Sequence, residues 1–271
     1  MKIGIFDSGY GGLTIWDKIS RKLPAYDYIY LGDNARTPYG TRSFEVVYHY
    51  TLQCVRALFD MDCRLVILAC NTASAKALRT IQQRDLPRLA PERRVLGVIR
   101  PTAEQIGRFT HSGVVGVVAT TGTVQSGSYP MEINKLFPDI TVVQQACPLW
   151  VPLIENNEHH HAGADYFVRT YLDQLFAQNS RIDTLVLACT HYPLLINKIR
   201  RYTPHGVQIV EQGALVADSL ADYLRRHTEI ASRCLQGGDT QFYTTESAEK
   251  FQQSATIFLN RAIKVHHIDI S

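Results

Sequence analysis

The chain has 271 residues, of which 45% are hydrophobic and 20% charged, so it is long enough for two domains, or one large one, with a sizeable core. A formal net charge of +3, without a block rich in Lys and Arg, does not indicate a nucleic-acid-binding protein. No apolar run approaches the roughly 20 residues that a membrane-spanning helix needs, and we expect no signal peptide. We therefore expect a cytoplasmic protein whose six cysteines are free thiols.

The first predicted strand, residues 2–6 (KIGIF), leads into the turn DSGYGG and a helix over residues 13–23. The glycine spacing matches neither of the common phosphate-binding patterns, GxxxxGKS/T and GxGxxG, so a nucleotide site is not favoured. An ordinary strand-to-helix turn capped by Asp7 or Ser8 explains the motif. Because Asp7 lies at the carboxyl end of its strand, it is also placed to face a ligand cleft.

The next strand, residues 28–31, precedes a loop with the turn sequence TPYG at residues 37–40. Residues 65–69 (LVILA) form an apolar run typical of a fully buried parallel strand. Cys70 ends that run, and a helix is predicted over residues 73–81. A cysteine therefore lies where a strand ends and a helix begins, which is the edge at which open α/β sheets bind ligands.

After a polar connector at residues 85–94, strands are predicted at residues 95–99 and 114–119. The second of these runs into Thr120 and a glycine-containing turn that repeats the pattern at the start of the chain. The run of three histidines at residues 159–161 resembles a metal site, but adjacent residues of a helix do not converge on one ion. We expect this run in an exposed loop or at the start of a helix.

A second cysteine, Cys189, follows the buried strand at residues 183–188 in the same manner as Cys70. The two motifs, ACNT and ACTH, each follow an apolar strand and precede a predicted helix. The separation between their cysteines nearly equals that between Asp7 and Thr120. Such equal offsets suggest an internal duplication that yields two similar α/β units.

We predict an α/β fold of two similar, doubly wound domains with mostly parallel sheets, related by a pseudo-twofold axis, with the active site in the cleft between them. The strand-like segments of the tail are expected to return to the first sheet. The first domain would then be discontinuous, comprising residues 1–97 and 208–271, and residues 98–207 would form the second.

Four kinds of chemistry use two cysteines that face each other. A redox dithiol normally has its cysteines close in sequence, and a metal site needs more soft ligands than His191 supplies. A single thiol nucleophile leaves the other cysteine without a role, and Cys147, which also follows a strand, competes for it. Two-base proton transfer needs one acid–base group on each face of a carbon, and two symmetry-related domains supply that geometry.

A free cysteine has a pKa of about 8.5, so each thiol needs help to act as a base. Helix N-termini after both cysteines favour thiolates. Asp7 and His191 are candidates to orient or shuttle protons beside the thiols. The side chains of Asn71, Thr72 and Thr190 lie at the same turns, where polar groups suit a carboxylate.

The motifs FDSGYGG, PYG, ACNTAS and ACTHYP together closely resemble those of the cofactor-independent glutamate racemases, within a wider family of aspartate, glutamate and hydantoin racemases. The resemblance continues through GVIRP, SGSY, ACPLWVPLIE and FYTT, and so covers essentially the whole chain. Departures such as Asn34, Gln212 and Asn260, where the family commonly has other residues, fall outside the proton-transfer set.

The resemblance implies that Cys70 deprotonates D-glutamate with the help of Asp7. Cys189 would deprotonate L-glutamate with the help of His191, which has Glu155 behind it. It further implies an enzyme without pyridoxal phosphate or metal, commonly a homodimer, that supplies D-glutamate for peptidoglycan in the cytoplasm. The positions that match substrate-contacting residues of the family are Asp7, Ser8, Pro38, Tyr39, Gly40, Asn71, Thr72, Thr120, Thr123, Thr190 and His191.

Overall fold

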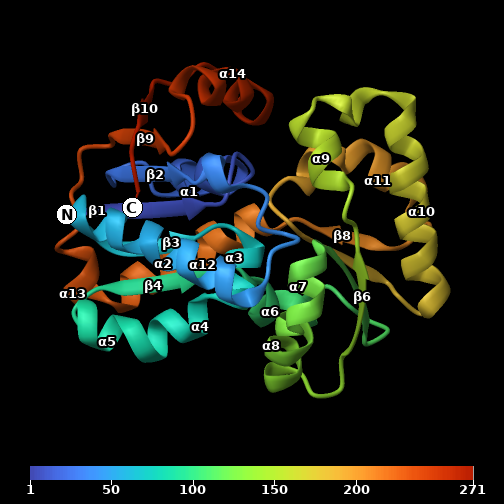
Figure 1. The fold of residues 1–271 in the computed structure, drawn as a ribbon. Coiled ribbons are helices and arrows are strands. Elements are labelled where there is room, and N and C mark those ends of the chain that lie inside the picture. Colours follow the sequence, from blue (N-terminus) through green and yellow to red (C-terminus); the bar gives the residue numbers. More distant parts are fainter. Residues whose placement is uncertain (271) are drawn as a thin grey trace.

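Two parallel β-sheets organise the chain in the computed structural model, which describes residues 1–270 (Figure 1). The first sheet has the strand order β10-β9-β2-β1-β3-β4 and the second the order β6-β5-β7-β8. Helices alternate with the strands along the chain, so the predicted α/β class with parallel sheets is confirmed. Both chain ends lie on the side of the first sheet (Figure 1).

The first sheet and its helices come from the two ends of the chain. Its strands are β1 (Lys2–Asp7), β2 (Tyr28–Gly32), β3 (Cys63–Leu68), β4 (Arg94–Gly97), β9 (Thr240–Thr244) and β10 (Val265–His267). The helical elements are α1 (Leu13–Lys22), η1 (Asn34–Arg36), α2 (Phe44–Asp60), α3 (Asn71–Lys76), α4 (Leu78–Thr80), η2 (Ile81–Asp85), α5 (Leu86–Leu89), α12 (Gln212–Arg226), α13 (Thr228–Ala231) and α14 (Ala248–Leu259).

The second sheet comes from the middle of the chain. Its strands are β5 (Val114–Ala119), β6 (Thr141–Ala146), β7 (Thr184–Ala188) and β8 (Gln208–Val210). The helical elements around it are α6 (Ile99–Gln105), η3 (Ile106–Arg108), α7 (Thr121–Ser126), α8 (Ser128–Leu136), α9 (Trp150–Glu155), η4 (Glu158–His160), α10 (Ala162–Gln178), η5 (Tyr192–Leu195) and α11 (Ile196–Tyr202).

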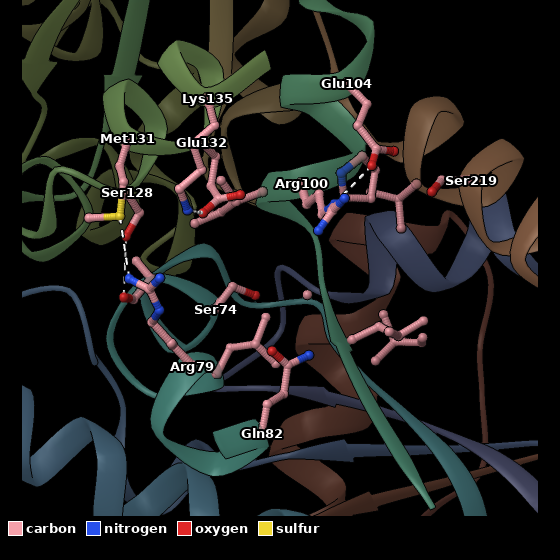
Figure 2. Close-up of a pocket in the computed structure, with 18 of the residues that line it drawn as sticks. Ser74, Arg79, Gln82, Arg100, Glu104, Ser128, Met131, Glu132, Lys135 and Ser219 are labelled. Atoms are coloured by element: carbon pink, nitrogen blue, oxygen red, sulfur yellow. Dashed lines mark hydrogen bonds and ion pairs between the residues drawn. The ribbon is translucent and has the colours of Figure 1, made fainter. Parts of the chain in front are cut away.

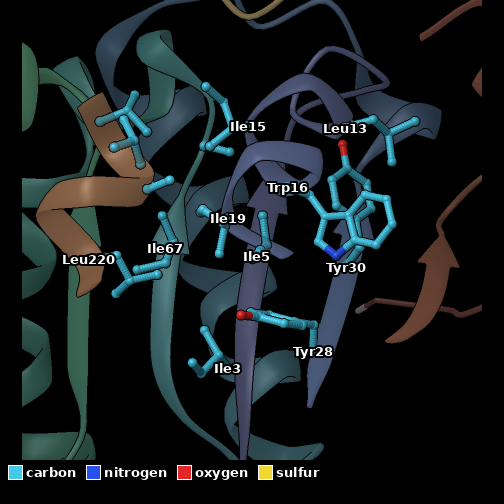
Figure 3. Close-up of a cluster of buried hydrophobic side chains, with 14 of the residues drawn as sticks. Ile3, Ile5, Leu13, Ile15, Trp16, Ile19, Tyr28, Tyr30, Ile67 and Leu220 are labelled. Atoms are coloured by element: carbon cyan, nitrogen blue, oxygen red, sulfur yellow. The ribbon is translucent and has the colours of Figure 1, made fainter. Parts of the chain in front are cut away.

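The central strands are buried on both faces, as their continuous apolar sequences predict. Every residue of β3, β5 and β7 is buried. On one face of the first sheet, Ile3 and Ile5 of β1 pack against Trp16 of α1 and Leu220 of α12 (Figure 3). On the other face, Phe6 belongs to a separate cluster with residues of α2 and β3. The alternation of strand side chains thus divides the core into two layers and holds the carboxyl ends of β1 and β3 side by side.

The tail returns to the first sheet as expected, because β9 pairs with β2 and β10 pairs with β9. Strand β8 instead pairs with β7. Residues 208–210, which we assigned to the first domain, therefore lie in the second sheet. The chain passes between the sheets after β4 and again after β8. The division into domains of residues 1–97 with 208–271 and of residues 98–207 otherwise stays a prediction.

Two local expectations were wrong. Residues 85–94 are not simply a connector, because they contain α5, whose Leu86 is buried against the α2 cluster. The strand expected at residues 95–99 ends at Gly97, and Ile99 already begins α6. The histidine run lies in η4 and at the start of α10, which is the second of the two places expected for it, and His159 is buried there. Within residues 1–270, no helix is both long enough and apolar enough to cross a membrane.

Candidate active site

Cys70 lies between the carboxyl end of β3 and the first turn of α3, where it caps the helix. Its Sγ accepts a hydrogen bond from Ala73 N over 3.5 Å and lies 3.3 Å from Ser8 Oγ, which comes from the turn after β1. Burial and, to a smaller extent, the neighbouring Asp7 carboxylate raise the pKa of the Cys70 thiol, the bonds to Ser8 and Ala73 lower it, and the net result is a pKa of about 12. This sulfur is therefore a thiol at neutral pH.

Asp7, the last residue of β1, is buried beside Cys70. Its Oδ2 accepts a hydrogen bond from Gly9 N over 3.0 Å, but its Oδ1 is buried without a partner in the described part of the chain. Burial raises the pKa of this carboxyl, while the positive charge of His191 lowers it. A buried carboxylate oxygen without a hydrogen-bond donor lowers the stability of the folded protein. Oδ1 is therefore positioned to accept a hydrogen bond from a donor group of a ligand.

Cys189 follows β7 in the corresponding position of the second sheet. Its Sγ lies 3.9 Å from His191 Nδ1, and His191 Nε2 lies 3.0 Å from Oε1 of Glu155, the last residue of α9. Burial alone would lower the pKa of His191, but its contacts with Cys189 and Glu155 raise it to about 10. An imidazolium at neutral pH stabilises negative charge on the adjacent sulfur.

The turn after β1 brings the two cysteine positions together. Thr14 Oγ1 donates a hydrogen bond to Thr190 O over 3.0 Å. Gly11 approaches the same segment so closely that a Cβ built on it would lie 2.3 Å from Thr190 Oγ1 and 2.4 Å from His191 Nδ1. The strand-end residues of both sheets thus meet in one buried junction. The absence of a side chain at Gly11 of the DSGYGG turn therefore allows this turn to pack directly against Thr190 and His191.

Three predicted threonines also meet across this junction. Thr72 Oγ1 lies 2.9 Å from Thr120 Oγ1 and 3.4 Å from Thr123 Oγ1, and the last two are 3.1 Å apart. Thr72 belongs to α3 on the first sheet, whereas the other two begin α7 on the second. A cluster of three hydroxyls can both donate and accept hydrogen bonds, as a carboxylate ligand requires.

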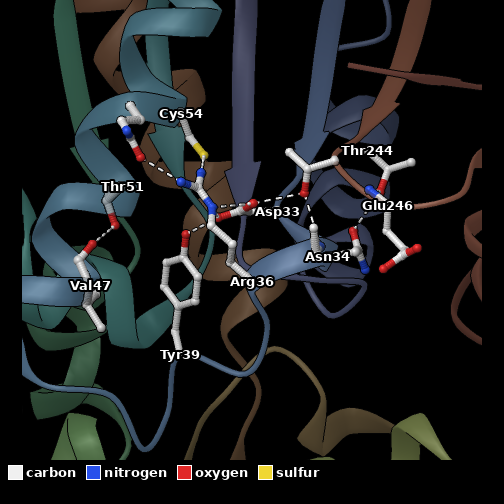
Figure 4. A network of polar contacts seen from close by, with 12 residues as sticks. Asp33, Asn34, Arg36, Tyr39, Val47, Thr51, Cys54, Thr244 and Glu246 are labelled. Carbon is white, nitrogen blue, oxygen red and sulfur yellow. Dashed lines mark hydrogen bonds and ion pairs between the residues drawn. The ribbon is translucent and has the colours of Figure 1, made fainter. Parts of the chain in front are cut away.

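The PYG loop reaches the second sheet through its backbone. Gly40 O accepts a hydrogen bond from Gly122 N over 2.8 Å. The Tyr39 side chain is buried and its hydroxyl donates to Asp33, whose two carboxylate oxygens also share a bifurcated hydrogen bond from Arg36 Nε (Figure 4). Pro38 is exposed on the loop. The polar end of Tyr39 therefore anchors the loop in the first sheet's half rather than meeting a ligand.

Asn71 is held by two residues to which the sequence analysis assigned no role in the site. Its side chain is hydrogen-bonded to Tyr129 and Gln212, over 2.7 Å in each case. A cavity of about 820 Å³ opens nearby, lined by Arg79, Arg100 and others of α4, α6 and α8, but neither Cys70 nor Cys189 lines it (Figure 2). The two sulfurs belong instead to the buried junction, where Cys70 is 6% and Cys189 7% exposed.

Other candidates from the sequence lie outside this junction or form no cluster. Cys147 is buried and its Sγ contacts Gln145 O over 3.7 Å, and burial raises the pKa of this thiol well above its ordinary value. Among residues 1–270, no three His, Cys, Asp or Glu side chains are arranged to hold a metal ion.

Fold and site together define an α/β enzyme that holds paired acid–base residues where the carboxyl ends of its two parallel sheets meet. The sequence model of the Asp/Glu/hydantoin racemases matches residues 3–220, and the chain belongs to this family. The resemblance inferred from the motifs is thereby confirmed.

Relatives and solved structures agree with this assignment. A glutamate racemase of Persephonella marina is 37% identical over 273 residues, covering 100% of this chain and 98% of the relative. The glutamate racemase isoform RacE1 of Bacillus anthracis superposes with a TM-score of 0.89 at 34% identity, covering 99% of this chain and 97% of that one. The glutamate racemase of Francisella tularensis in complex with D-glutamate gives a TM-score of 0.88 at 30% identity, with the same coverage.

Proposed function

We propose that this protein is a glutamate racemase, which interconverts L- and D-glutamate by moving the α-proton between Cys70 and Cys189. The observation that carries the proposal is the pairing of two strand-end cysteines, each with its own proton partner, in one junction. Asp7 accompanies Cys70, and His191, backed by Glu155, accompanies Cys189. Inversion at Cα needs a base on one face and an acid on the other, and this pair supplies both.

The two cysteines have different surroundings. Burial raises the pKa of the Cys70 thiol, whereas Cys189 lies beside His191, whose pKa is raised to about 10. With L-glutamate bound, Cys189 acts as the base that removes the α-proton, and Cys70 donates its proton to the opposite face. The product, D-glutamate, leaves Cys70 as the thiolate that begins the reverse reaction. Asp7 and His191 then return the protons to their resting distribution.

The substrate's charged groups match polar groups of the junction. The unpartnered Asp7 Oδ1 is suited to accept a hydrogen bond from the α-ammonium group. The hydroxyls of Thr72, Thr120 and Thr123 and the N-termini of α3 and α7 suit the carboxylates. We assign the remaining contacts to Ser8, Pro38, Tyr39, Gly40, Asn71, Thr190 and His191, with the PYG loop and Asn71 acting mainly through their backbone.

The relatives named above support glutamate over other amino acids. From the family resemblance of the motifs we also propose that the protein works in the cytoplasm as a homodimer and supplies D-glutamate for peptidoglycan. We further propose that it needs neither pyridoxal phosphate nor a metal ion. The two thiols supply both the base and the acid of the reaction, so the proposed mechanism assigns no proton transfer to a cofactor.

The proposal is tested by incubating the purified protein with L-glutamate in D2O without pyridoxal phosphate, with and without a chelator and a carbonyl reagent. Loss of optical rotation with deuterium entering Cα, unchanged by either reagent, is the expected result. Cys70→Ser and Cys189→Ser are each expected to abolish racemisation, whereas Cys63→Ser, a buried thiol at the far end of β3, keeps it. Exchange with aspartate but not glutamate would reassign the substrate. No exchange with either would refute two-base chemistry.

A further inference from the structure

Three buried side chains next to Cys70 form a closed ring of hydrogen bonds. Asn71 Nδ2 donates to Gln212 Oε1 over 2.7 Å, and Gln212 Nε2 donates to the Tyr129 hydroxyl over 2.6 Å. That hydroxyl donates to Asn71 Oδ1 over 2.7 Å and so completes the ring. None of the three residues is more than 3% exposed. Because all the bonds run in one direction around the ring, each polarises the next.

A backbone carbonyl decides the direction of the ring. Gln212 Nε2 also lies 3.3 Å from Val98 O and 2.9 Å from Thr102 Oγ1, and its two hydrogens are shared among these two acceptors and the Tyr129 hydroxyl. A carbonyl oxygen only accepts, so the amide nitrogen of Gln212 faces Val98 and its oxygen faces Asn71. Asn71 must then present Nδ2 to Gln212 and Oδ1 to the Tyr129 hydroxyl. The side chain of Asn71 is thus held in one of its two amide orientations.

The ring also joins the segments where the chain passes between the sheets. Val98 follows β4 of the first sheet, and Gln212 begins α12 just after β8 of the second. Tyr129 lies in α8 and Asn71 is the first residue of α3, directly after Cys70. Through the ring, the first turn of α3 is fixed to both crossing segments and to the second sheet's half of the molecule.

We propose that Gln212 is a positioning residue for proton transfer at Cys70, acting through Asn71. The Cys70 sulfur accepts from Ala73 N in the same first turn of α3, so the position of that turn determines how well a thiolate is stabilised there. Cys189 is supported from another helix and another sheet, by His191 and Glu155. Loss of the ring should therefore impair one of the two proton transfers and spare the other. This inference rests on the proposed racemase activity.

The kinetic test compares wild type, Gln212→Leu and Tyr129→Phe with α-deuterated D- and L-glutamate as substrates. We expect kcat/KM to fall at least tenfold in both variants. When transfer at Cys70 becomes slower, the primary isotope effect on D-glutamate, which Cys70 deprotonates, rises, and that on L-glutamate falls. A merely structural role lowers the active fraction and moves neither isotope effect. Tyr28→Phe, which also deletes a buried tyrosine hydrogen bond, to Leu23 O, is the matched control and should keep both isotope effects.

A second measurement tests the ring without relying on activity. In the wild-type protein the side-chain amide protons of Asn71, assigned by their absence from the Asn71→Asp spectrum, should be protected from exchange with solvent. We expect Gln212→Leu to remove that protection while the overall spectrum stays folded. Persistent protection, or unchanged isotope effects in active variants, would overturn the inference. A wild-type protein that does not racemise glutamate but shows the protection would instead refute the proposed function and leave the ring standing as the device that orients Asn71.

Discussion

The two halves of the site pack tightly against each other at Gly11, and alanine there should damage the site without unfolding the protein. Gly11 lies outside the left-handed backbone region, so its dihedral angles suit alanine. The new methyl group, however, would lie 2.3 Å from Thr190 Oγ1 and 2.4 Å from His191 Nδ1, where ordinary contact begins at 3.4 Å. Gly11 cannot easily retreat, because its carbonyl accepts hydrogen bonds from Thr14 N and Thr14 Oγ1.

The segment containing Thr190 and His191 must therefore move by about 1 Å, the difference between the required and available distances at Nδ1. A displacement of about 1 Å at a catalytic group costs roughly 100-fold in rate, which corresponds to about 2.7 kcal/mol of transition-state stabilisation. Overpacking of this kind typically lowers the free energy of unfolding by about 1–3 kcal/mol. The expected variant is folded, somewhat less stable and about 100-fold less active.

The measurement is kcat/KM for glutamate racemisation by circular dichroism, together with thermal unfolding of the same samples. Gly163→Ala is the matched control, because no atom lies within 4 Å of the methyl group it adds near the start of α10. That control should keep full activity and gain up to about 1 kcal/mol of stability. A Gly11→Ala variant with wild-type kcat/KM and an unchanged unfolding midpoint would refute the reasoning, since it would mean that His191 has no fixed place in the site.

Three further predictions concern charge. Glu155→Gln removes a contact that raises the pKa of His191, so the alkaline limb of the kcat/KM profile should move to lower pH; an unmoved limb would count against an imidazolium in the mechanism. Iodoacetamide at pH 7 should alkylate Cys189 before Cys70, because burial raises the pKa of the Cys70 thiol while Cys189 lies beside the charged His191; peptide mass spectrometry showing the reverse order would contradict this reasoning. Asp183 is partly desolvated, yet hydrogen bonds from Thr110 and two backbone N–H groups hold its pKa below the ordinary value. Asp183→Ala should therefore lower the free energy of unfolding by about 1.5–3 kcal/mol at pH 7. The difference from wild type should shrink below about pH 4, the unfolded pKa, as the native carboxyl becomes protonated.

Local patterns were enough to predict the parallel sheets and the residues at their carboxyl ends. Buried strands such as β3 and β7 have continuous apolar sequences, and open α/β sheets bind their ligands at the carboxyl ends of such strands. Cys70 and Cys189 were found for this reason, and the structure places them in one junction. Strand β8 was placed on the wrong side of the domain boundary because a three-residue strand carries no pattern that names its partner; its pairing with β7 depends on the fold around it.

Contacts between distant segments were beyond the reach of such patterns, and they account for the residues that were missed. Tyr129 and Gln212 look like ordinary helix residues in the sequence, since a buried polar side chain is recognised only when its partner is known. Tyr39 shows the converse. Its motif suggests a ligand contact, yet its hydroxyl donates a hydrogen bond to Asp33. The loop instead contacts the second sheet's half through the Gly40 carbonyl, which accepts a hydrogen bond from Gly122 N. The proposed proton-transfer residues are therefore recognisable from local sequence, whereas their relative position depends on a few polar side chains that meet only in the folded protein. For this reason, substitutions at Gln212 and Gly11 should affect catalysis although neither residue exchanges a proton.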